Sequence, residues 1–220
     1  MATPGAGMMR MAHMAHDTQL NAAQRAGVAM SAAPGVAVAR PLATGAATMT
    51  NPVLTTRLIL RRPIAADLAN FTAFMMSDRA IHFGAYRNEG KAFRAFAAEL
   101  GHWEIYGHGM WTVTMRGDDT ALGLVGPWTP PDWPETEIGW MMFSEQTEGT
   151  GIATEAARAA LRHAYGVLGW TTAVSYIDHH NTRSIRLAER LGATVDDFAK
   201  RPHAHPDCMV YRHSKPQDLP

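Results

Sequence analysis

The sequence predicts one mixed α/β domain built on a central sheet that contains both antiparallel and parallel strands. Apolar residues make up 46% of the 220-residue chain and charged residues 18%, which is typical of a globular protein with enough chain for a sizeable core. From Thr55 onward, short strand patterns alternate with amphipathic helical patterns. In the middle of the chain two strand patterns flank a long helical one, and such a unit places its two strands parallel. We therefore expect a mixed sheet with flanking helices.

The individual elements follow from hydrophobic periodicity and from the residues that interrupt it. Segment 57–61 alternates polar and apolar residues and stops before Pro63, which is typical of a strand. Segment 91–106 repeats large apolar residues at helical spacing, from Phe93 to Trp103. The expected strands are 57–61, 109–115, 121–126, 137–143, 170–177, 194–198 and 209–213, the expected helices are 65–77, 91–106, 151–168 and 184–191, and a loop rich in Trp and Pro is expected over 127–134.

Residues 1–50 differ in composition from the rest of the chain. They are rich in Ala and Met, and the first aromatic residue of the sequence is Phe71. Without large side chains this segment cannot bury enough apolar surface to offset the conformational entropy lost on ordering. We therefore expect a disordered or weakly helical extension over 1–50, a folded domain over 51–214 and a flexible tail over 215–220.

Charge and cysteine content exclude several classes of protein. Lys plus Arg and Asp plus Glu number 20 each, which argues against a nucleic-acid partner, because such a partner needs a basic face. Cys208 is the single cysteine, so a disulfide framework and a Cys-rich zinc site are excluded and the chain fits a reducing, cytoplasmic setting. The histidine pair His179 and His180 has no acidic or Cys companions at ligand spacing, so no metal is expected. No apolar run approaches the ~20 residues of a membrane span, so no membrane partner is expected.

A turn containing two glycines precedes the long helix predicted over 151–168. In segment 146–153 (QTEGTGIA), Gly149 and Gly151 let the backbone curl so that successive N–H groups point into one concavity. The helix adds its unpaired first N–H groups and the positive end of its dipole, which suits a pyrophosphate. A P-loop is excluded because no Gly-Lys-Ser/Thr follows. A dinucleotide fingerprint would need a third glycine where Thr154 stands, and Asp178 after the next strand keeps that alternative open. A simple tight turn is also consistent with the two glycines.

The residues around this turn resemble the signature of a known family. Gln-x-x-Gly-x-Gly opening a helix directly after an apolar strand resembles the acetyl-coenzyme A signature of the GNAT superfamily of N-acetyltransferases. Segments 181–184 (NTRS) and 187–193 (LAERLGA) are similar to the next element of that superfamily, and 149–157 (GTGIATEAA) is similar to the branch of the ribosomal-protein-alanine N-acetyltransferases. The resemblance covers about 55–213. It implies a single GNAT-like domain with a splayed parallel strand pair, acetyl-CoA as co-substrate and, in many relatives, a homodimer.

The resemblance also assigns residues to the binding of acetyl-CoA. The strand before the turn would separate from its parallel neighbour and leave main-chain groups for the pantetheine arm, the amides of 149–153 would cradle the pyrophosphate, and two residues at the next helix would reach the arm from across the cleft. Relatives often carry Lys or Arg at position 150, so Thr150 removes a phosphate contact that Arg183 or Arg186 would have to replace. The expected binding residues are Met141, Met142, Phe143, Gln146, Gly149, Thr150, Gly151, Ile152, Ala153, Thr154, Asn181 and Ser184.

Acetyl transfer to an amine needs a neutral amine near the thioester and a proton for the leaving thiolate. By analogy with relatives, Glu137 is the expected base, acting through a water, and the alternatives are a solvated acid at a strand end and a member of an ion pair. Many members carry Tyr where Ala188 stands, so Ser184 is the expected acid, with helix capping or cofactor contact as alternatives. His179 is an alternative base.

The acceptor amine is left open between a protein N-terminus and a small molecule, because acceptor pockets are built from variable loops. Trp128 and Trp133 in the 127–134 loop are expected to form an aromatic lid beside that pocket. A non-catalytic CoA-binding sensor or interaction module on the same fold is the main alternative, favoured by Thr150 and by the missing Tyr. An oxidoreductase that binds a nucleotide through the two glycines and Asp178 is a second alternative.

Overall fold

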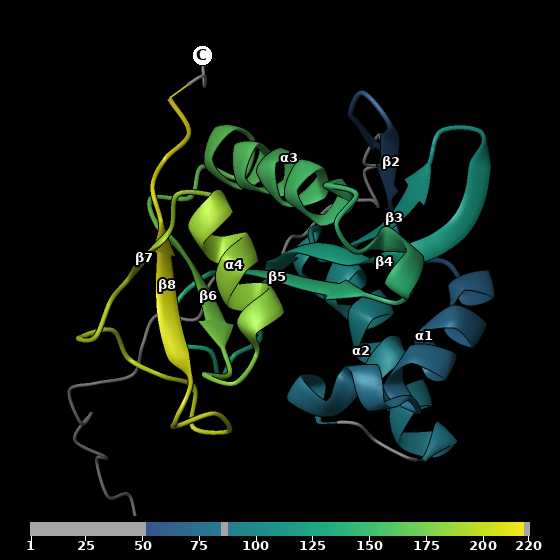
Figure 1. The fold of residues 1–220 in the computed structure, drawn as a ribbon, viewed down its shortest axis with the longest axis horizontal. Helices are drawn as coiled ribbons and strands as arrows, with labels where there is room; N and C mark the ends of the chain where they lie inside the picture. Colours follow the sequence, from purple (N-terminus) through teal and green to yellow (C-terminus); the bar gives the residue numbers. More distant parts are fainter. Residues whose placement is uncertain (1–51, 85–87, 218–220) are drawn as a thin grey trace, which may run out of the picture. The chain divides into compact units, whose positions relative to one another are not determined.

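The computed structural model describes residues 52–84 and 88–217, and these residues form a mixed sheet with helices on both faces (Figure 1). The strands are β1 (Val53–Leu54), β2 (Leu58–Arg61), β3 (Trp111–Met115), β4 (Asp118–Trp128), β5 (Glu137–Met142), β6 (Ala173–Ile177), β7 (Thr194–Val195) and β8 (Met209–His213). The α-helices are α1 (Leu68–Met75), α2 (Glu89–Tyr106), α3 (Ile152–Gly166) and α4 (Thr182–Arg190), and short 3₁₀ helices occur at Ala65–Asp67, Asp78–Phe83 and Glu145–Thr147.

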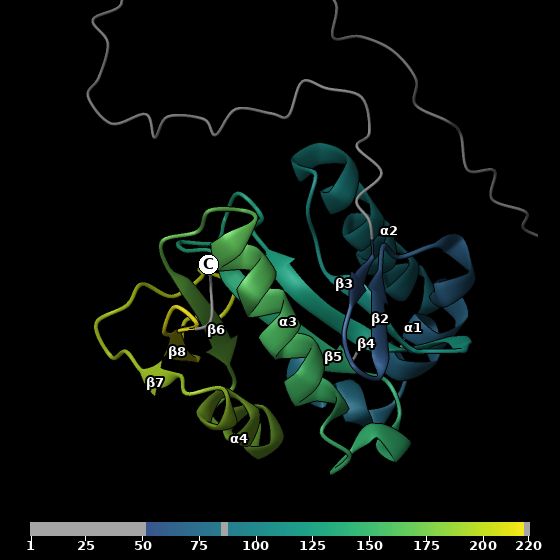
Figure 2. The ribbon, with the colours of Figure 1, turned by 90° about the horizontal axis from the view of Figure 1, so that it is seen from above.

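The strands lie in the order β1-β2-β3-β4-β5-β6-β8-β7. Each neighbouring pair of described strands is antiparallel except β5 and β6, which are parallel because α3 returns the chain to the same end of the sheet. Figure 2 shows β6, β7 and β8 with α4 at one end of this sheet and β2 and β3 at the other. The predicted mixed α/β class is therefore confirmed.

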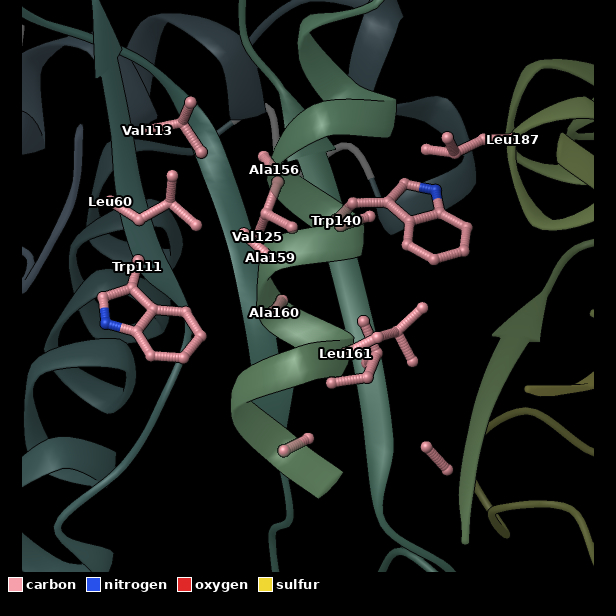
Figure 3. Close-up of a cluster of buried hydrophobic side chains, with 14 of the residues drawn as sticks. Leu60, Trp111, Val113, Val125, Trp140, Ala156, Ala159, Ala160, Leu161 and Leu187 are labelled. Carbon is pink, nitrogen blue, oxygen red and sulfur yellow. The ribbon is translucent and has the colours of Figure 1, made fainter. Parts of the chain in front are cut away.

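Helix α3 packs its alanine-rich face directly on the sheet. Ala156, Ala160 and Ala164 are fully buried, and Figure 3 shows this face of α3 turned to the side chains that rise from β2, β3 and β4. Alanine has no side chain beyond Cβ, so the helix axis comes close to the strands without a clash. The helix that begins at the glycine turn is thereby held in a defined position over β5.

The opposite face of the sheet is covered by α1 and α2. Leu124 of β4 packs with Phe71 and Phe74 of α1 and Phe96 of α2, whereas its neighbour Val125 packs on the α3 side. This opposition follows from the alternation of side chains along a strand. The aromatic cluster on this face supplies one wall of the cleft described below.

Each strand and helix expected from the sequence has a counterpart, with ends shifted by a few residues, but the loop expected over 127–134 begins later. Strand β4 continues through Trp128, because Pro127 and Trp128 pair with Ile138 and Glu137 of β5. Pro127 is tolerated because hydrogen-bonded positions alternate in an antiparallel pair and its missing N–H does not point at β5. The short β1 and the 3₁₀ helix Asp78–Phe83 carry no clear periodic pattern and were not expected.

The domain boundaries stay a prediction. The extension expected over 1–50 and the last residues of the tail expected over 215–220 lie outside the described residues. Within the described part of the chain, every helix is too short or too polar to cross a bilayer.

Candidate active site

The parallel strands β5 and β6 meet at one end and separate toward the other. Across the described part of this pair there is one register partnership, Glu137 with Val174, and Val174 N–H donates to Thr136 O at 3.0 Å. One residue further on, a side chain replaces the backbone bond, because Ser175 Oγ donates to Ile138 O at 2.6 Å. Beyond that point β6 no longer pairs with the edge of β5 that faces it, so the main chain of Trp140 is available to a ligand, whereas Met142 O already accepts a long hydrogen bond from Arg79 Nη2 at 3.5 Å.

The pairing of β5 with β4 decides which main-chain groups face the opening. Phe143 N–H donates to Leu122 O at 2.9 Å, and hydrogen-bonded positions alternate along an antiparallel pair. The main chain of Phe143 and Met141 is therefore turned to β4, and the main chain of Trp140 and Met142 is turned to the opening. On this geometry Met142 offers its main chain, Met141 lines the cleft with its side chain only, and Trp140 joins the candidates, while the binding role of each stays a prediction.

The glycine turn has the curled backbone that the sequence predicts. Gly149 has φ 71° and Gly151 has φ 79°, both in the left-handed region that favours glycine. The Thr150 hydroxyl donates to Thr147 O at 2.6 Å and so closes the turn. Helix α3 begins at Ile152, so the N–H groups of its first turn have no partner within the helix. A Cβ added at Gly149 would meet nothing within 4 Å, which leaves room for an anion.

The other expected loop residues lie at the same end of the sheet. Gln146 is an exposed member of the 3₁₀ helix that precedes the turn. Ile152, Ala153 and Thr154 make the first turn of α3, and the Ile152 side chain is buried in the core. These helix residues therefore offer their N–H groups to a ligand rather than their side chains.

Three arginines surround the turn. Glu148 bonds Arg79 Nη1 at 2.7 Å and lies 3.2 Å from Arg183 Nη1, and Arg57 Nη1 donates to Thr150 O at 3.0 Å. Arg183 is one of the two cations that the sequence analysis named as replacements for a basic residue at 150. Arg57 and Arg79 were missed because they precede the turn by more than 60 residues, and only the fold brings them there.

The start of α4 faces the open edge of β5. Asn181 Oδ1 accepts the Ser184 N–H at 3.1 Å and caps the helix, so the capping role considered for Ser184 belongs to Asn181. Trp140 Nε1 donates to Ser184 Oγ at 3.0 Å, and Figure 3 shows the indole turned toward Leu187 of α4. Both Asn181 and Ser184 are buried and line the cleft, as expected for residues that reach a ligand from across the opening.

The opening leads into a cleft of about 640 Å³. Residues of α1, α2, β4, β5 and β6, the start of α4 and segment 204–208 line it. Most of its walls are apolar or aromatic. Trp128 stacks on His102, with ring centroids 4.7 Å apart, and lines the cleft from β4 rather than from a loop. Trp133 is the lid candidate that does lie in a loop, and it contacts the carboxylate described next. The large apolar lining residues are Phe71, Met75, Phe83, Met110, Trp128 and Trp133.

Glu137 holds its carboxylate inside the cleft. Its side chain is 8% exposed, Oε2 accepts Trp133 Nε1–H at 2.5 Å, and Oε1 accepts Tyr176 N–H at 3.3 Å. Burial raises the pKa of Glu137 to about 7, and the two hydrogen bonds oppose that rise. Glu137 therefore lies where β5 and β6 begin to separate, with a pKa suited to a general base near neutral pH. The alternative of a solvated strand-end acid is wrong.

A second carboxylate, Glu99 of α2, lines the same cleft. It is 6% exposed, and its Oε2 has no hydrogen-bond partner among the described residues. Burial, and after it the charge of Glu137, raises the pKa of Glu99 to about 8. The sequence analysis missed this residue, although a signal exists: Glu99 follows Phe96 by three positions and precedes Trp103 by four, so a charge stands on the apolar face of the helix.

Asp178, His179 and Cys208 also line the cleft. Asp178 lies 3.3 Å from His82 Nδ1 and accepts the His180 N–H at 2.7 Å, and His179 Nδ1 lies 4.0 Å from Asp178. Burial raises the pKa of the Cys208 thiol, which disfavours the nucleophilic thiolate. Over 52–84 and 88–217, no three His, Cys, Asp or Glu side chains gather as a metal site requires.

Comparison with known families and sequences agrees with this arrangement. Residues 57–194 match a family model described as "Acetyltransferase (GNAT) domain". The "Uncharacterized protein YkkB" of Bacillus subtilis (strain 168) is 34% identical over 89 residues, which are 40% of this chain and 51% of that protein, so the match spans about half the length of this relative.

Solved structures give the same result. The acetyltransferase of Agrobacterium tumefaciens str. C58 is 31% identical, with a TM-score of 0.69 over 83% of this chain and 99% of that one. The ribosomal-protein alpha-N-acetyltransferase RimL in complex with coenzyme A is 14% identical, with a TM-score of 0.56 over 74% of this chain and 97% of that one, and so shares the fold.

Proposed function

The chain belongs to the GNAT acetyltransferase family and is an acyltransferase, and from this premise we propose that it transfers the acetyl group of acetyl-CoA to a primary amine by direct attack. The observation that carries this proposal is the buried Glu137 carboxylate at the point where β5 and β6 separate. At that point the opening between β5 and β6 meets a largely apolar cleft that would admit an amine.

The glycine turn would hold the pyrophosphate of acetyl-CoA. The curled backbone at Gly149, Thr150 and Gly151 and the first N–H groups of α3 supply donors and the positive end of the helix dipole. Arg183 and Arg79 lie beside this turn, both paired with Glu148, and each would exchange that carboxylate for a phosphate to supply the positive charge that Thr150 lacks. The site therefore fits a diphosphate without a basic residue inside the turn.

The pantetheine arm would lie along the open edge of β5. The main-chain groups of Trp140 and Met142 face it from one side, and Asn181 and Ser184 line it from the other. Main-chain hydrogen bonds to the amides of the arm would continue the pairing along β5 past the point where β6 diverges from it. The thioester would then reach the cleft near Glu137.

Glu137 would take the proton of the incoming ammonium, directly or through a water. With a pKa of about 7, the Glu137 carboxyl group is ionised in about half of the protein molecules at pH 7. A peptide α-amine with pKa near 8 is about a tenth neutral at pH 7, whereas a lysine near 10.4 is about 0.04% neutral. A base of modest strength therefore suffices for α-amines, and lysine side chains demand more help.

Ser184 would protonate the leaving thiolate. Its Oγ accepts a hydrogen bond from Trp140 Nε1, so its own O–H proton is free to point into the cleft. The amine nitrogen forms a bond to the carbonyl carbon and the C–S bond breaks. The proton taken from the ammonium leaves to solvent through Glu137, and the second proton, which the nitrogen loses as the amide forms, replaces the one that Ser184 gives to the thiolate. Direct attack needs no acyl-enzyme intermediate. The raised pKa of the Cys208 thiol agrees with this, because it disfavours the thiolate that would carry the acetyl group.

An acetyl-CoA thiol-release screen across short peptides and small amines tests this proposal. We expect amine-dependent release of CoA thiol and an N-acetylated product by mass spectrometry, with no acetyl group on the protein when the acceptor is omitted. CoA binding without thiol release for every acceptor would instead favour the non-catalytic sensor. Loss of activity in Cys208→Ser, with CoA affinity retained, would refute direct attack.

A further inference from the structure

The Glu99 carboxylate of α2 has a feature that its packing does not explain. It lies on the buried face of the helix between Phe96 and Trp103, where apolar side chains are the rule. Its Oε2 is buried, and no described residue donates a hydrogen bond to it. Burying an unpaired carboxyl costs stability, so such a group calls for a function or a ligand.

Glu99 and Glu137 approach the cleft from different elements. Glu99 belongs to α2 and Glu137 to β5, both side chains are less than 9% exposed, and both line the same cavity. The charge of Glu137 contributes to the raised pKa of Glu99, so the two carboxyl groups feel one another. Two acidic groups in one apolar cavity create a negative potential that attracts a cation and repels a carboxylate.

The rest of the cavity limits the body of that cation. Apolar and aromatic side chains such as Phe71, Met110 and Trp128 make up most of its walls, and its lining also includes Asp178, Asp207 and three histidines. An apolar or aromatic substituent on the amine would fill the apolar part of this space.

We propose that Glu99 is an acceptor-binding residue that, together with Glu137, selects an apolar monoamine in its ammonium form and excludes acceptors with a carboxylate next to the amine. This inference rests on the proposed function and assigns its substrate class. The ammonium would donate hydrogen bonds to Glu99 and Glu137, and its proton would leave through Glu137 before the nitrogen attacks. Glu99 then holds the substrate while Glu137 takes the proton.

Isothermal titration calorimetry on the CoA-loaded full chain at pH 8.5 tests the inference without turnover. The probes are 2-phenylethylamine, L-phenylalaninamide, L-phenylalanine and 2-phenylethanol, which share one ring and differ in the charge near it. We expect phenylethylamine, which is cationic at this pH, to bind most tightly. Phenylalaninamide, an α-amine with pKa near 8 that is about a quarter protonated at pH 8.5, should bind about fourfold more weakly, and phenylalanine and the alcohol at least ~10-fold more weakly, as for loss of a charged hydrogen bond. Equal affinity for phenylethylamine and phenylalanine would overturn the inference.

The variants Glu99→Gln and Glu89→Gln separate a binding role from a structural one. Glu89 is an exposed carboxylate at the start of the same helix, so its variant controls for charge removal on α2. Glu99→Gln is expected to weaken phenylethylamine ~10- to 100-fold and to leave the Kd of CoA unchanged, whereas Glu89→Gln leaves both unchanged. Unaltered amine affinity in Glu99→Gln would overturn the inference.

Thiol release with the same probes distinguishes the two proposals. Selective binding of phenylethylamine and phenylalaninamide without thiol release would refute the proposed acetyl transfer, and Glu99 would then be an ammonium-binding residue but not an acceptor-binding one. Thiol release that is equally fast with phenylalanine and phenylalaninamide would support acetyl transfer and overturn the selection by Glu99.

Discussion

Replacing Glu137 by Gln removes the proposed base and keeps the shape of the side chain. The buried carboxylate accepts hydrogen bonds from Trp133 Nε1 and Tyr176 N–H, and Gln retains an oxygen that can accept one of them. Loss of a general base typically lowers turnover by ~10²–10⁴. We therefore expect Glu137→Gln to reduce kcat/KM by that factor at pH 8 and to spare the affinity for CoA.

The pH dependence of this effect follows from the pKa of about 7 that burial gives Glu137. Only the ionised carboxylate accepts a proton, so the ionised fraction is about a half at pH 7, about a tenth at pH 6 and about a hundredth at pH 5. The ratio of wild-type to Glu137→Gln kcat/KM should therefore be flat above pH 8 and fall about tenfold per unit below pH 7. The titration of the acceptor amine affects both proteins equally and cancels in the ratio.

Thiol release with one acceptor, measured between pH 5.5 and 9, gives this ratio, and Glu89→Gln serves as the matched control. A ratio near one at every pH would remove Glu137 from the mechanism. A ratio that stays constant down to pH 5.5 would show that burial does not raise the pKa of this carboxyl group, and the electrostatic reasoning would fail.

Three further predictions concern the surroundings of the site. Trp133→Phe removes the Nε1–H bond that lowers the pKa of Glu137, so the acid limb of kcat/KM should move to higher pH by up to about one unit, and an unmoved limb would contradict this. Gly151→Val places a side chain at φ 79° in the turn and should abolish CoA binding by calorimetry, while Gly169→Ala, at φ 67° in another loop, should retain it. Glu99→Gln should stabilise the protein, because folding raises the pKa of Glu99 from 4.5 to about 8. The cost of burying the ionised carboxylate is absent below pH 4.5, grows between pH 4.5 and 8, and stays constant above pH 8. The Tm gain over wild type should thus be several degrees larger at pH 8.5 than at pH 5, and a gain independent of pH would refute this.

Local features of the site could be predicted from the chain alone. The left-handed conformations of Gly149 and Gly151 and the start of α3 depend on residues next to each other, so the turn was predictable. Glu137 and Ser184 could be named because they stand at recognisable places in a family pattern. The cleft between β5 and β6 agrees with that pattern as well.

Contacts between distant segments could not be predicted in this way. Arg57 and Arg79 reach the glycine turn from residues far earlier in the chain, and Glu99 meets the cavity of Glu137 because α2 packs on one face of the sheet. Each of these side chains looks like an ordinary charged residue in its own segment. Only its burial and its neighbours in space give it a distinct chemistry.

The order of strands and helices, the glycine turn and the apolar faces were encoded in short stretches of sequence, since hydrogen bonding and side-chain spacing act over a few residues. The tertiary structure decided the register of β5 against β4, and with it that Trp140 and Met142, not Met141 and Phe143, turn their main chain to the opening. A shift of one residue exchanges the two sets, because hydrogen-bonded positions alternate along a strand. Packing of the whole sheet selects that register, and no local pattern carries it.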